Sequence, residues 1–423
     1  MTDRFDKEIE KEVAEYRLGD PYPDDLPSCI TPWTSICLAA NGDIKTCCQY
    51  DGQGEFNIYT KNSTLVEAHE AYADLRQQLI NGEKPDKCRA CWKQETTTGS
   101  SRRMWMLQKI RNKPKTYTVD APFELRHMDL NFGNTCNLKC RMCGSWGSTH
   151  WFKDDARLQA RNPLYERHIG DSEPRTIDVT MWRSMEEKLS NMERIDFKGG
   201  EPLMQDGMYE VLQMLVNNGS APNVELGYVT NGTKTPERLK ELWPHFKKIN
   251  LNVSIEATGK LYQYIRGSEV QTIEQLEQNL KFYDQFDNAK GHFSTAISIY
   301  NIFDLQNLAD WIDKVTADLK QWKHMIADRT SDSLIEYQRP NEFNLLVTKP
   351  AYLDPNNLPN HLKERVLETW DKGYHSLDFL REHLFKTQYK EDQWQLFKNF
   401  THDLDEIRKT NVLDYIPQLE GEL

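Results

Sequence analysis

Hydrophobic and polar residues alternate with two different periods in the middle of the chain. Residues 203–217 carry apolar side chains at helical spacing, and Asn218-Gly219 is a typical helix stop. Short apolar runs at 224–229, 251–255 and 293–300 predict strands, because turn-forming or polar residues follow each of them. Strands that alternate with helices indicate a parallel sheet in an α/β fold, with functional groups gathered at the carboxyl ends of the strands.

The pattern beyond these strands is weaker. Residues 305–340 look helical and polar, and residues 343–348 are expected to form a further strand that Lys349-Pro350 ends. Residues 359–411 predict two amphipathic helices rich in tryptophan. Such a tail usually serves packing, and the alternative is that it caps the open end of the sheet and shapes a substrate pocket.

Composition favours a cytoplasmic protein. The chain has 423 residues, a formal charge of -12 and nine cysteines. It begins with charged residues in place of an apolar signal region, and no apolar run is long enough to span a membrane, so neither secretion nor membrane insertion is expected. Cysteines in such a context argue for metal or redox use over disulfides. The negative charge argues against attraction of the whole protein to nucleic acid.

One stretch is basic. Between Arg76 and Tyr117 there are eleven Lys or Arg residues against three Asp or Glu, and several of them surround Trp105. Most such runs are solvated helix faces. The alternative is a docking surface for an anionic substrate such as a phosphorylated metabolite or an RNA.

Three cysteines lie close together at Cys136, Cys140 and Cys143, in the spacing C-x3-C-x2-C. Thiolates are the soft ligands that iron-sulfur clusters require, and a tight loop gathers three of them with little loss of chain entropy. Because no fourth cysteine is near, a 4Fe-4S cluster there would keep one iron free of protein ligand. The alternatives are a zinc site, for which His150 is the only nearby fourth ligand, and three unrelated core cysteines.

A glycine pair follows about sixty residues later. Residues 194–198 alternate between apolar and polar and run into Gly199-Gly200-Glu201-Pro202, which predicts a strand that ends in a turn. Two adjacent glycines allow the backbone to approach a ligand closely.

The cysteine loop and the glycine turn together resemble the radical S-adenosylmethionine (SAM) superfamily. The resemblance implies a partial (β/α)6 barrel and a 4Fe-4S cluster whose open iron takes the amino and carboxylate groups of SAM. Reductive cleavage of SAM would then give a 5'-deoxyadenosyl radical that abstracts hydrogen from a substrate. A one-electron donor such as flavodoxin or ferredoxin is implied as partner. One departure is Met142, which stands where the superfamily usually has an aromatic residue.

Further positions are carried over by the same resemblance. The backbone of the Gly-Gly turn is expected to bind the methionine amino group, and Ser254 and Arg266 the SAM carboxylate and ribose. Glu256 stands where relatives usually have Asp. The expected cofactor-binding residues are Gly199, Gly200, Glu201, Pro202, Asn231, Ser254, Glu256 and Arg266.

The other six cysteines lie between residues 29 and 91. Asn41-Gly42-Asp43 predicts a hairpin turn, with Cys47 and Cys48 on the returning strand. The region resembles the twitch domain, a shortened SPASM domain, although twitch domains generally follow the barrel. The resemblance implies an auxiliary 4Fe-4S cluster with four ligands, and the spacing alone also suits zinc. These expected ligands are Cys29, Cys47, Cys88 and Cys91, with Cys48 as an alternative to Cys47 and with Cys37 left over.

These expectations divide the chain into five parts. They are an N-terminal helical extension (1–28), a twitch-like auxiliary cluster domain (29–100), a linker helix (101–122), the partial barrel (123–350) and a helical C-terminal region (351–423).

The expected function is hydrogen abstraction with the auxiliary cluster as electron acceptor or substrate ligand, giving net oxidation of a small molecule. The alternatives are a peptide maturase that forms crosslinks or epimers and a non-catalytic metal-binding scaffold. An epimerase would need a thiol donor, for which Cys37 or Cys48 would serve. The 28 residues before Cys29 tilt the expectation slightly against a dedicated leader-peptide maturase.

Overall fold

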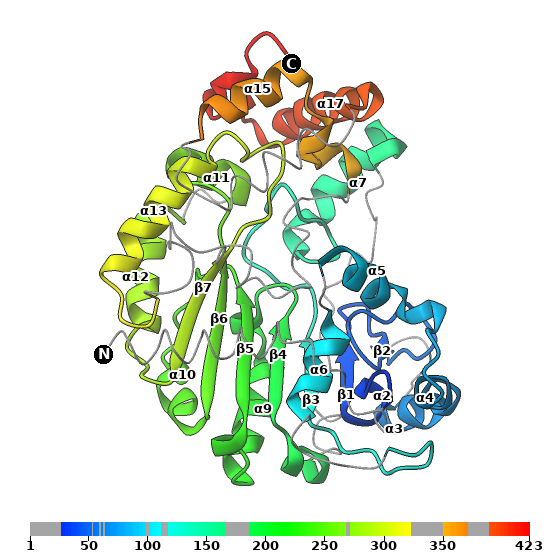
Figure 1. Cartoon of the computed structure of the whole chain (residues 1–423). Helices are drawn as coiled ribbons and strands as arrows, with labels where there is room; N and C mark the ends of the chain where they lie inside the picture. Colours follow the sequence, from blue (N-terminus) through cyan, green and yellow to red (C-terminus); the bar gives the residue numbers. More distant parts are fainter. Residues whose placement is uncertain are drawn as a thin grey trace. The chain divides into compact units, whose positions relative to one another are not determined.

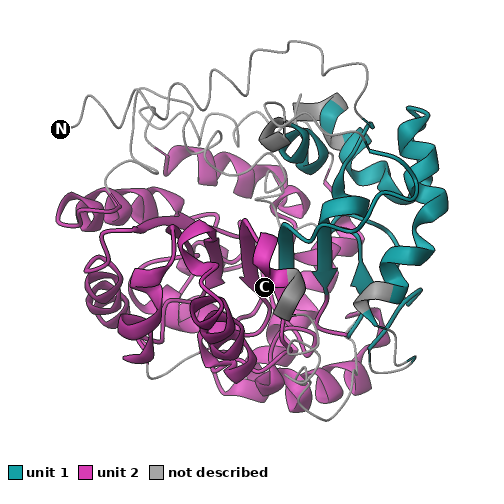
Figure 2. Ribbon diagram, turned by 90° about the horizontal axis from the view of Figure 1, so that it is seen from below, with its two compact units in different colours: residues 1–38, 42–129 teal, residues 39–41, 130–423 magenta. Residues whose placement is uncertain are grey.

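The computed structural model forms two compact units. It describes residues 27–52, 54–58, 61, 64–98, 101–110, 117–165, 186–267, 271–322, 350–370 and 389–423. The first unit comprises residues 1–38 and 42–129, and the second comprises residues 39–41 and 130–423 (Figure 2). Residues 1–26 of the predicted N-terminal helical extension and the predicted strand at 343–348 lie outside the described residues.

The first unit contains a short β-hairpin. After α2 (Thr31–Thr34), strand β1 (Ser35–Leu38) pairs antiparallel with β2 (Ile44–Lys45). Gly42, between the strands, has φ of 85°, which favours glycine. The hairpin prediction is therefore confirmed. Cys47 and Cys48 come after the end of β2, however, so their placement on the returning strand was wrong.

Helices make up most of the remaining described part of the first unit. The chain enters α3 through a capping box, in which Thr64 and Glu67 exchange hydrogen bonds. The region predicted as a linker helix contains α6, and its described residues after 116 are not helical. The helices are α3 (Leu65–Ala71), α4 (Ala73–Ile80), the 3-10 turn η1 (Asp86–Cys88), α5 (Arg89–Thr98) and α6 (Arg102–Ile110).

The second unit is built on a parallel sheet (Figure 1). Strands β4 (Arg194–Lys198), β5 (Glu225–Thr230), β6 (Lys248–Ser254) and β7 (Ala289–Ser294) pair in this order, all parallel. The predicted parallel α/β architecture is thus confirmed for these strands. The strand predicted at 293–300 instead covers 289–294. The boundary between the units falls within β3 (His127–Asn131).

Helices connect and follow the strands, as the apolar periodicity predicted for α9. Those after β4 are α9 (Asp206–Asn217), α10 (Arg238–Leu242), α11 (Gly259–Arg266), α12 (Ile273–Tyr283), α13 (Leu305–Ala317), α15 (Asn360–Glu368) and α17 (Glu391–Arg408). Helix α7 (Phe152–Arg161) precedes β4 in the chain. Short 3-10 turns are η2 (Thr149–Trp151), η3 (Pro163–Tyr165), η4 (Glu186–Asn191), η5 (Pro202–Met204), η6 (Ala221–Asn223), η7 (Trp243–His245), η8 (Ala351–Leu353), η9 (Pro355–Asn357), η10 (Val412–Asp414) and η11 (Pro417–Leu419).

The sheet β4 to β7 has one apolar and one polar face. On the apolar face, Phe293 packs edge-on against Trp311 of α13 with ring centroids 5.6 Å apart. The opposite positions are polar, and five of them line one pocket: Asp196, Lys198, Asn250, Asn252 and His292. We call these five residues the polar face. Parallel sheets buried on both faces are usually apolar on both, so the alternation indicates that this side lines a polar interior.

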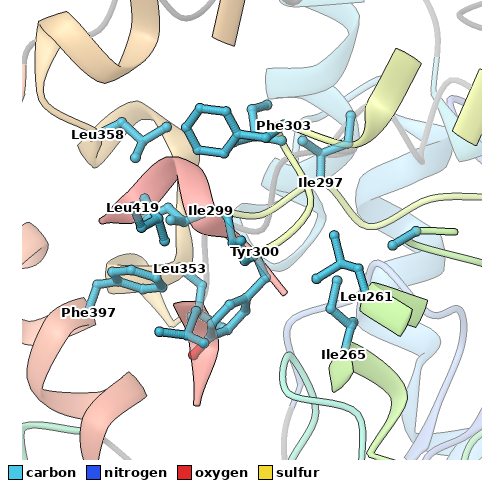
Figure 3. Close-up of a cluster of buried hydrophobic side chains, with 14 of the residues drawn as sticks. Leu261, Ile265, Ile297, Ile299, Tyr300, Phe303, Leu353, Leu358, Phe397 and Leu419 are labelled. Carbon is cyan, nitrogen blue, oxygen red and sulfur yellow. The ribbon is translucent and has the colours of Figure 1, made fainter. Parts of the chain in front are cut away.

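The C-terminal helices share an apolar core with α11 and the loop after β7. Figure 3 shows this cluster. It buries Leu261 and Ile265 of α11, Tyr300 of the loop after β7, and Phe397 of α17. The tryptophan-rich tail therefore packs, because Trp370 and Trp394 belong to the same cluster. None of the described helices is both long and apolar enough to cross a membrane.

Candidate functional site

The loop with Cys136, Cys140 and Cys143 follows β3 and is held by backbone hydrogen bonds. The amide of Cys143 donates to the carbonyl of Cys140 at 2.9 Å. The amides of Lys139 and Arg141 donate to the carbonyls of Arg266 and Ile265, at 3.3 and 2.7 Å. The end of α11 therefore holds the middle of the loop in place.

The Gly-Gly turn after β4 packs against the start of this loop. Gly199 and Gly200 have φ of 78° and 49°, in the left-handed region. A Cβ on Gly200 would lie 2.2 Å from the carbonyl oxygen of Thr135, and a Cβ on Gly199 would lie 1.7 Å from Asn131 Oδ1. Only glycine permits this approach, since any side chain would collide. The amide of Glu201 then donates to Thr135 O at 2.9 Å, beside the first cysteine.

Glu201 ties the ends of β4 and β5 together. Its fully buried carboxylate accepts hydrogen bonds from the backbone amide of Asn231 at 2.8 Å and from the Thr230 hydroxyl at 2.7 Å. It also accepts from the Leu203 amide at 3.1 Å. Burial raises the pKa of Glu201, and these hydrogen bonds oppose the rise. Pro202 begins the 3-10 turn η5 that follows. Glu201 thus positions Asn231 from within the sheet.

Two of the predicted polar residues donate to cysteine sulfurs. Asn231 Nδ2 lies 3.6 Å from Cys136 Sγ, and Arg266 Nη1 lies 3.7 Å from Cys140 Sγ. The Leu138 amide also donates to Cys136 Sγ at 3.5 Å. Hydrogen bonds to sulfur ligands orient them and tune the potential of an iron-sulfur cluster.

Arg266 also forms a buried ion pair with Glu256. Its Nε lies 2.7 Å from Glu256 Oε2, and both side chains are at most 6% exposed. Arg266 Nη2 is buried without a hydrogen-bond partner among the described residues. Ser254, half-buried, ends β6 two residues before Glu256. The structure therefore gathers the carried-over residues at one edge of the sheet, with a buried donor available beside Cys140.

The donor set at the loop fits an iron-sulfur cluster with SAM. A structural zinc site has four protein ligands, and this loop supplies three thiols. A cubane cluster gives each thiolate its own iron. Three soft donors, the close glycine turn and the buried unpaired donor of Arg266 together fit a cluster with SAM.

Burial raises the pKa of two of the loop thiols, Cys136 and Cys140. Burial raises the pKa of Cys136 to about 12, with a further contribution from Cys140. Burial also raises the pKa of Cys140, and Arg266 opposes the rise. Metal binding at this loop must therefore displace protons.

Four cysteines of the first unit line a single pocket. They are Cys29, Cys47, Cys88 and Cys91. Burial is the main cause that raises the pKa of Cys47, followed by the charges of Cys48, Cys29, Cys91 and Cys88. Cys48 does not line this pocket, and Cys37 lies on β1. None of the nine cysteines, all of which lie in the described part of the chain, forms a disulfide.

Local contacts explain how distant segments bring these thiols together. The amide of Asp51, after Cys47, donates to the carbonyl of Lys87 at 2.8 Å. Asp51 also pairs with Arg89 at 2.7 Å, and Glu55 pairs with Lys87. The loop after the hairpin is thus fastened to η1 and the start of α5, which carry Cys88 and Cys91.

The start of α6 supplies positive charge to this pocket. The Arg103 amide donates to the thiol of Cys91, and its guanidinium lies near enough to act on Cys29, Cys88 and Cys91. Arg103 is held by Glu95 and stacks on Trp92 at 4.2 Å. A helix N-terminus and a cation both favour anionic thiolates.

The basic stretch is accounted for in part by burial. Arg76 and Arg102 are 4% exposed, and Arg102 donates to Asp129 at 2.9 Å. Arg103 pairs with Glu95 and stacks on Trp92. These three residues therefore form internal contacts. Arg111, Lys113 and Lys115 lie outside the described residues, so the docking interpretation stays a prediction for that segment.

Sequence reasoning missed the residues that hold the cysteine loop from outside it. Arg141, between two cysteines, is fully buried and donates to Asp405 of α17. An arginine within the cysteine loop was visible in the sequence, but no local pattern identified its partner 264 residues away.

Comparison with known families matches residues 130–312 to the Radical SAM superfamily. Residues 130–312 are therefore similar to the radical SAM domain, a family whose cofactors are a 4Fe-4S cluster and SAM. The matched range includes the three-cysteine loop, the Gly-Gly turn and Arg266. No curated protein matches the chain.

Several solved structures are similar at low identity. Native anSMEcpe with bound AdoMet is 15% identical, with 45% of this chain and 48% of that chain covered and a TM-score of 0.30. SuiB of Streptococcus suis bound to the precursor peptide SuiA is 12% identical, with 64% and 58% covered and a TM-score of 0.32. TYW1 with a lysine-pyruvate adduct is 13% identical, with 45% and 62% covered and a TM-score of 0.27. The chain thus spans less than two thirds of each of these structures.

Proposed function

We propose that the chain is a radical SAM enzyme that oxidises a small polar molecule, with an auxiliary 4Fe-4S cluster as electron acceptor. One observation carries the proposal. Within the radical SAM domain, a loop with only three thiols is fixed against a Gly-Gly turn that admits no side chain. A protein that needed only a structural metal would supply a fourth ligand.

The residues of the second unit divide the work of holding the cofactors. Cys136, Cys140 and Cys143 would ligate the cluster, and the Gly199-Gly200 backbone would face SAM. Arg266, paired with Glu256, would bind the SAM carboxylate or ribose through its unpartnered Nη2 and hold Cys140 through Nη1. When bound, the cluster and SAM supply hydrogen abstraction by a radical.

The remaining predicted residues would act at the ends of the strands. Asn231 would orient Cys136 by its hydrogen bond to the sulfur, and Glu201 would hold Asn231. Pro202 would fix the backbone after the glycine turn, and Ser254 would contact SAM from the end of β6.

The pocket of the first unit supports electron transfer over substrate binding. Cys29, Cys47, Cys88 and Cys91 supply a full set of four thiolates, which would leave no iron open to a substrate. Leu79 and Trp92 line the same pocket together with Arg102 and Arg103, so apolar side chains and two cations surround the thiols. Arg103 would favour the reduced, more negative cluster, as an electron acceptor requires.

The polar face supports a polar substrate. Lys198 immediately precedes the Gly-Gly turn, and Asn252 and His292 are directly paired across β6 and β7. These side chains offer hydrogen-bond donors and acceptors near the strand ends where SAM would bind. A substrate oriented by them would need matching polar groups.

Anaerobic reconstitution tests the proposal. The enzyme should take up about eight irons per chain and release 5'-deoxyadenosine from SAM when reduced with dithionite. One zinc per four cysteines, with no 5'-deoxyadenosine, would support the non-catalytic scaffold instead.

The size of the substrate can be tested separately. The low-molecular-weight fraction of a cell extract should raise the rate of 5'-deoxyadenosine release by the reconstituted enzyme. Stimulation only by the retained macromolecular fraction would favour a peptide or protein substrate.

A further inference from the structure

We propose that the C-terminal helix α17 and the turn after it are part of the SAM-cluster site, because Asp405 holds Arg141 and with it the peptide between Cys140 and Cys143. Both residues are positioning residues. This inference rests on the proposed function, since it concerns the loop that would hold the cluster. It adds a segment outside the matched range 130–312 to that site.

Arg141 is enclosed on every side. Its side chain is 0% exposed, and its guanidinium carbon lies 3.5 Å from the ring centroid of Tyr264 and 5.5 Å from that of Tyr300. It donates to Asp405, to Thr410 Oγ1 at 2.9 Å and to the carbonyl of Tyr264 at 3.2 Å. These contacts hold the Arg141 guanidinium in one position. Because Cys140 directly precedes Arg141 in the chain, they also restrict the backbone beside Cys140.

Asp405 is the centre of the anchoring contacts. Its carboxylate accepts from the Tyr264 hydroxyl at 3.0 Å, from Thr410 Oγ1 at 2.7 Å and from the Val412 amide at 2.7 Å, besides Arg141. Two of these donors lie in the turn after α17, and Tyr264 lies in α11. A single carboxylate therefore joins the cysteine loop, α11 and the C-terminal turn, and no other carboxylate reaches Arg141 among the described residues.

A second contact from the same end of α17 reaches the same peptide. Arg408 lies over the Trp151 ring at 4.4 Å and donates to Asp154 at 2.9 Å. The Trp151 indole in turn donates to the carbonyl of Cys140 at 3.0 Å. The peptide that follows Cys140 is thus held through its carbonyl by Trp151 and through the next side chain by Asp405.

The anchoring segment has its own support in the apolar core. Phe397 and Leu404 of α17 are fully buried in the cluster of Figure 3, together with Ile265 of α11. Because this core fixes α17, loss of the charge at Asp405 is expected to loosen the cysteine loop while the helix stays packed.

The test uses Asp405→Asn in the reconstituted full chain. Asparagine keeps the size of the side chain and loses the charge that balances Arg141. We expect iron loss to a chelator to become about tenfold faster or more, as for other partners of metal ligands. We also expect the SAM-induced change in the EPR spectrum of the reduced cluster to weaken. The metal-free variant should unfold at a lower temperature, because a buried arginine loses its counter-charge, but its far-UV circular dichroism at the reconstitution temperature should match that of the wild type.

Two further variants make the test decisive. Tyr264→Phe keeps the ring against Arg141 and removes one donor to Asp405, so iron loss should accelerate by about fivefold. Glu406→Gln, on the next residue of α17, removes an exposed contact with Arg161 and should change nothing. If Asp405→Asn does not fold, Tyr264→Phe decides alone.

Wild-type iron retention and SAM response in both Asp405→Asn and Tyr264→Phe would overturn the inference. Absence of iron from the wild-type protein would instead refute the proposed function.

Discussion

The two cysteine groups of this chain differ in how they are assembled. The loop group takes three thiols from eight consecutive residues and braces them from outside, by α11, the Gly-Gly turn and α17. The pocket group takes four thiols from separate segments between residues 29 and 91 and encloses them with Trp92 and Arg103. A short loop with three thiols would leave one iron of a 4Fe-4S cluster without a protein ligand, and other elements must hold the loop in place. Four thiols from separate segments supply every iron with a ligand. In the function that we propose, the first group is therefore the reactive one and the second accepts electrons.

The largest expected effect follows from removal of a loop thiol. Cys140→Ala should abolish 5'-deoxyadenosine release and lower the iron content from about eight to about four per chain. Cys37→Ala, a buried cysteine of β1 in neither group, is the matched control and should keep both values. Residual cleavage in Cys140→Ala above the rate without protein would contradict the assignment of the loop.

Removal of a pocket thiol should block product formation and spare the cleavage of SAM. Cys88→Ala should also hold about four irons but retain release of 5'-deoxyadenosine, because the loop group is untouched. Oxidised product should no longer form from the substrate that the extract experiment identifies. If both cysteine variants lose cleavage alike, the division of labour between the two groups is wrong.

The Gly-Gly turn should matter for SAM binding through close approach and backbone conformation together. Gly200→Ala would place a Cβ 2.2 Å from the Thr135 carbonyl, with φ of 49°. We expect at least a tenfold weaker Kd for SAM by titration calorimetry, since a backbone shift there moves the cysteine loop.

The matched control for this substitution is Gly219→Ala. Gly219 also has positive φ, 76°, but a Cβ there would meet nothing within 4 Å. It should lower stability by about 1 kcal/mol through backbone strain alone and leave the Kd for SAM unchanged. Equal losses of SAM affinity in both variants would show that strain, and not close approach, is responsible.

The smallest expected effect distinguishes two adjacent cysteines. Cys48→Ala should leave iron content and activity unchanged, because Cys48 does not line the pocket, whereas Cys47→Ala should lose the auxiliary iron. Iron analysis and absorbance in the thiolate-to-iron charge-transfer bands measure the cluster content of both variants. The reverse result would exchange the two residues as ligand.

The sequence predicted the elements that depend on local pattern. The hairpin, α9 and strands β5 and β6 followed from turn residues and apolar periodicity, and the resemblance to the twitch domain named the four cysteines that line one pocket. The strand predicted at 293–300 was displaced because Ile297, Ile299 and Tyr300 are apolar for another reason: they pack in the C-terminal core. The true strand β7 alternates, with His292 on the polar face, and so has no continuous apolar run.

Other features depend on tertiary contacts that no local pattern encodes. The contact between Arg141 and Asp405 joins residues far apart in sequence, and the ion pair of Glu256 with Arg266 gives both residues a partner that the carried-over roles did not include. The roles of the site residues toward SAM and the bounds of the domains remain predictions.

The measurement that tests the central claim most directly is metal and sulfide analysis of a variant with Cys136, Cys140 and Cys143 all replaced by alanine, reconstituted without oxygen beside the wild type. The account predicts about eight irons in the wild type and about four, with equal sulfide, in the variant. A single zinc in the variant, or an iron content equal to that of the wild type, would contradict it.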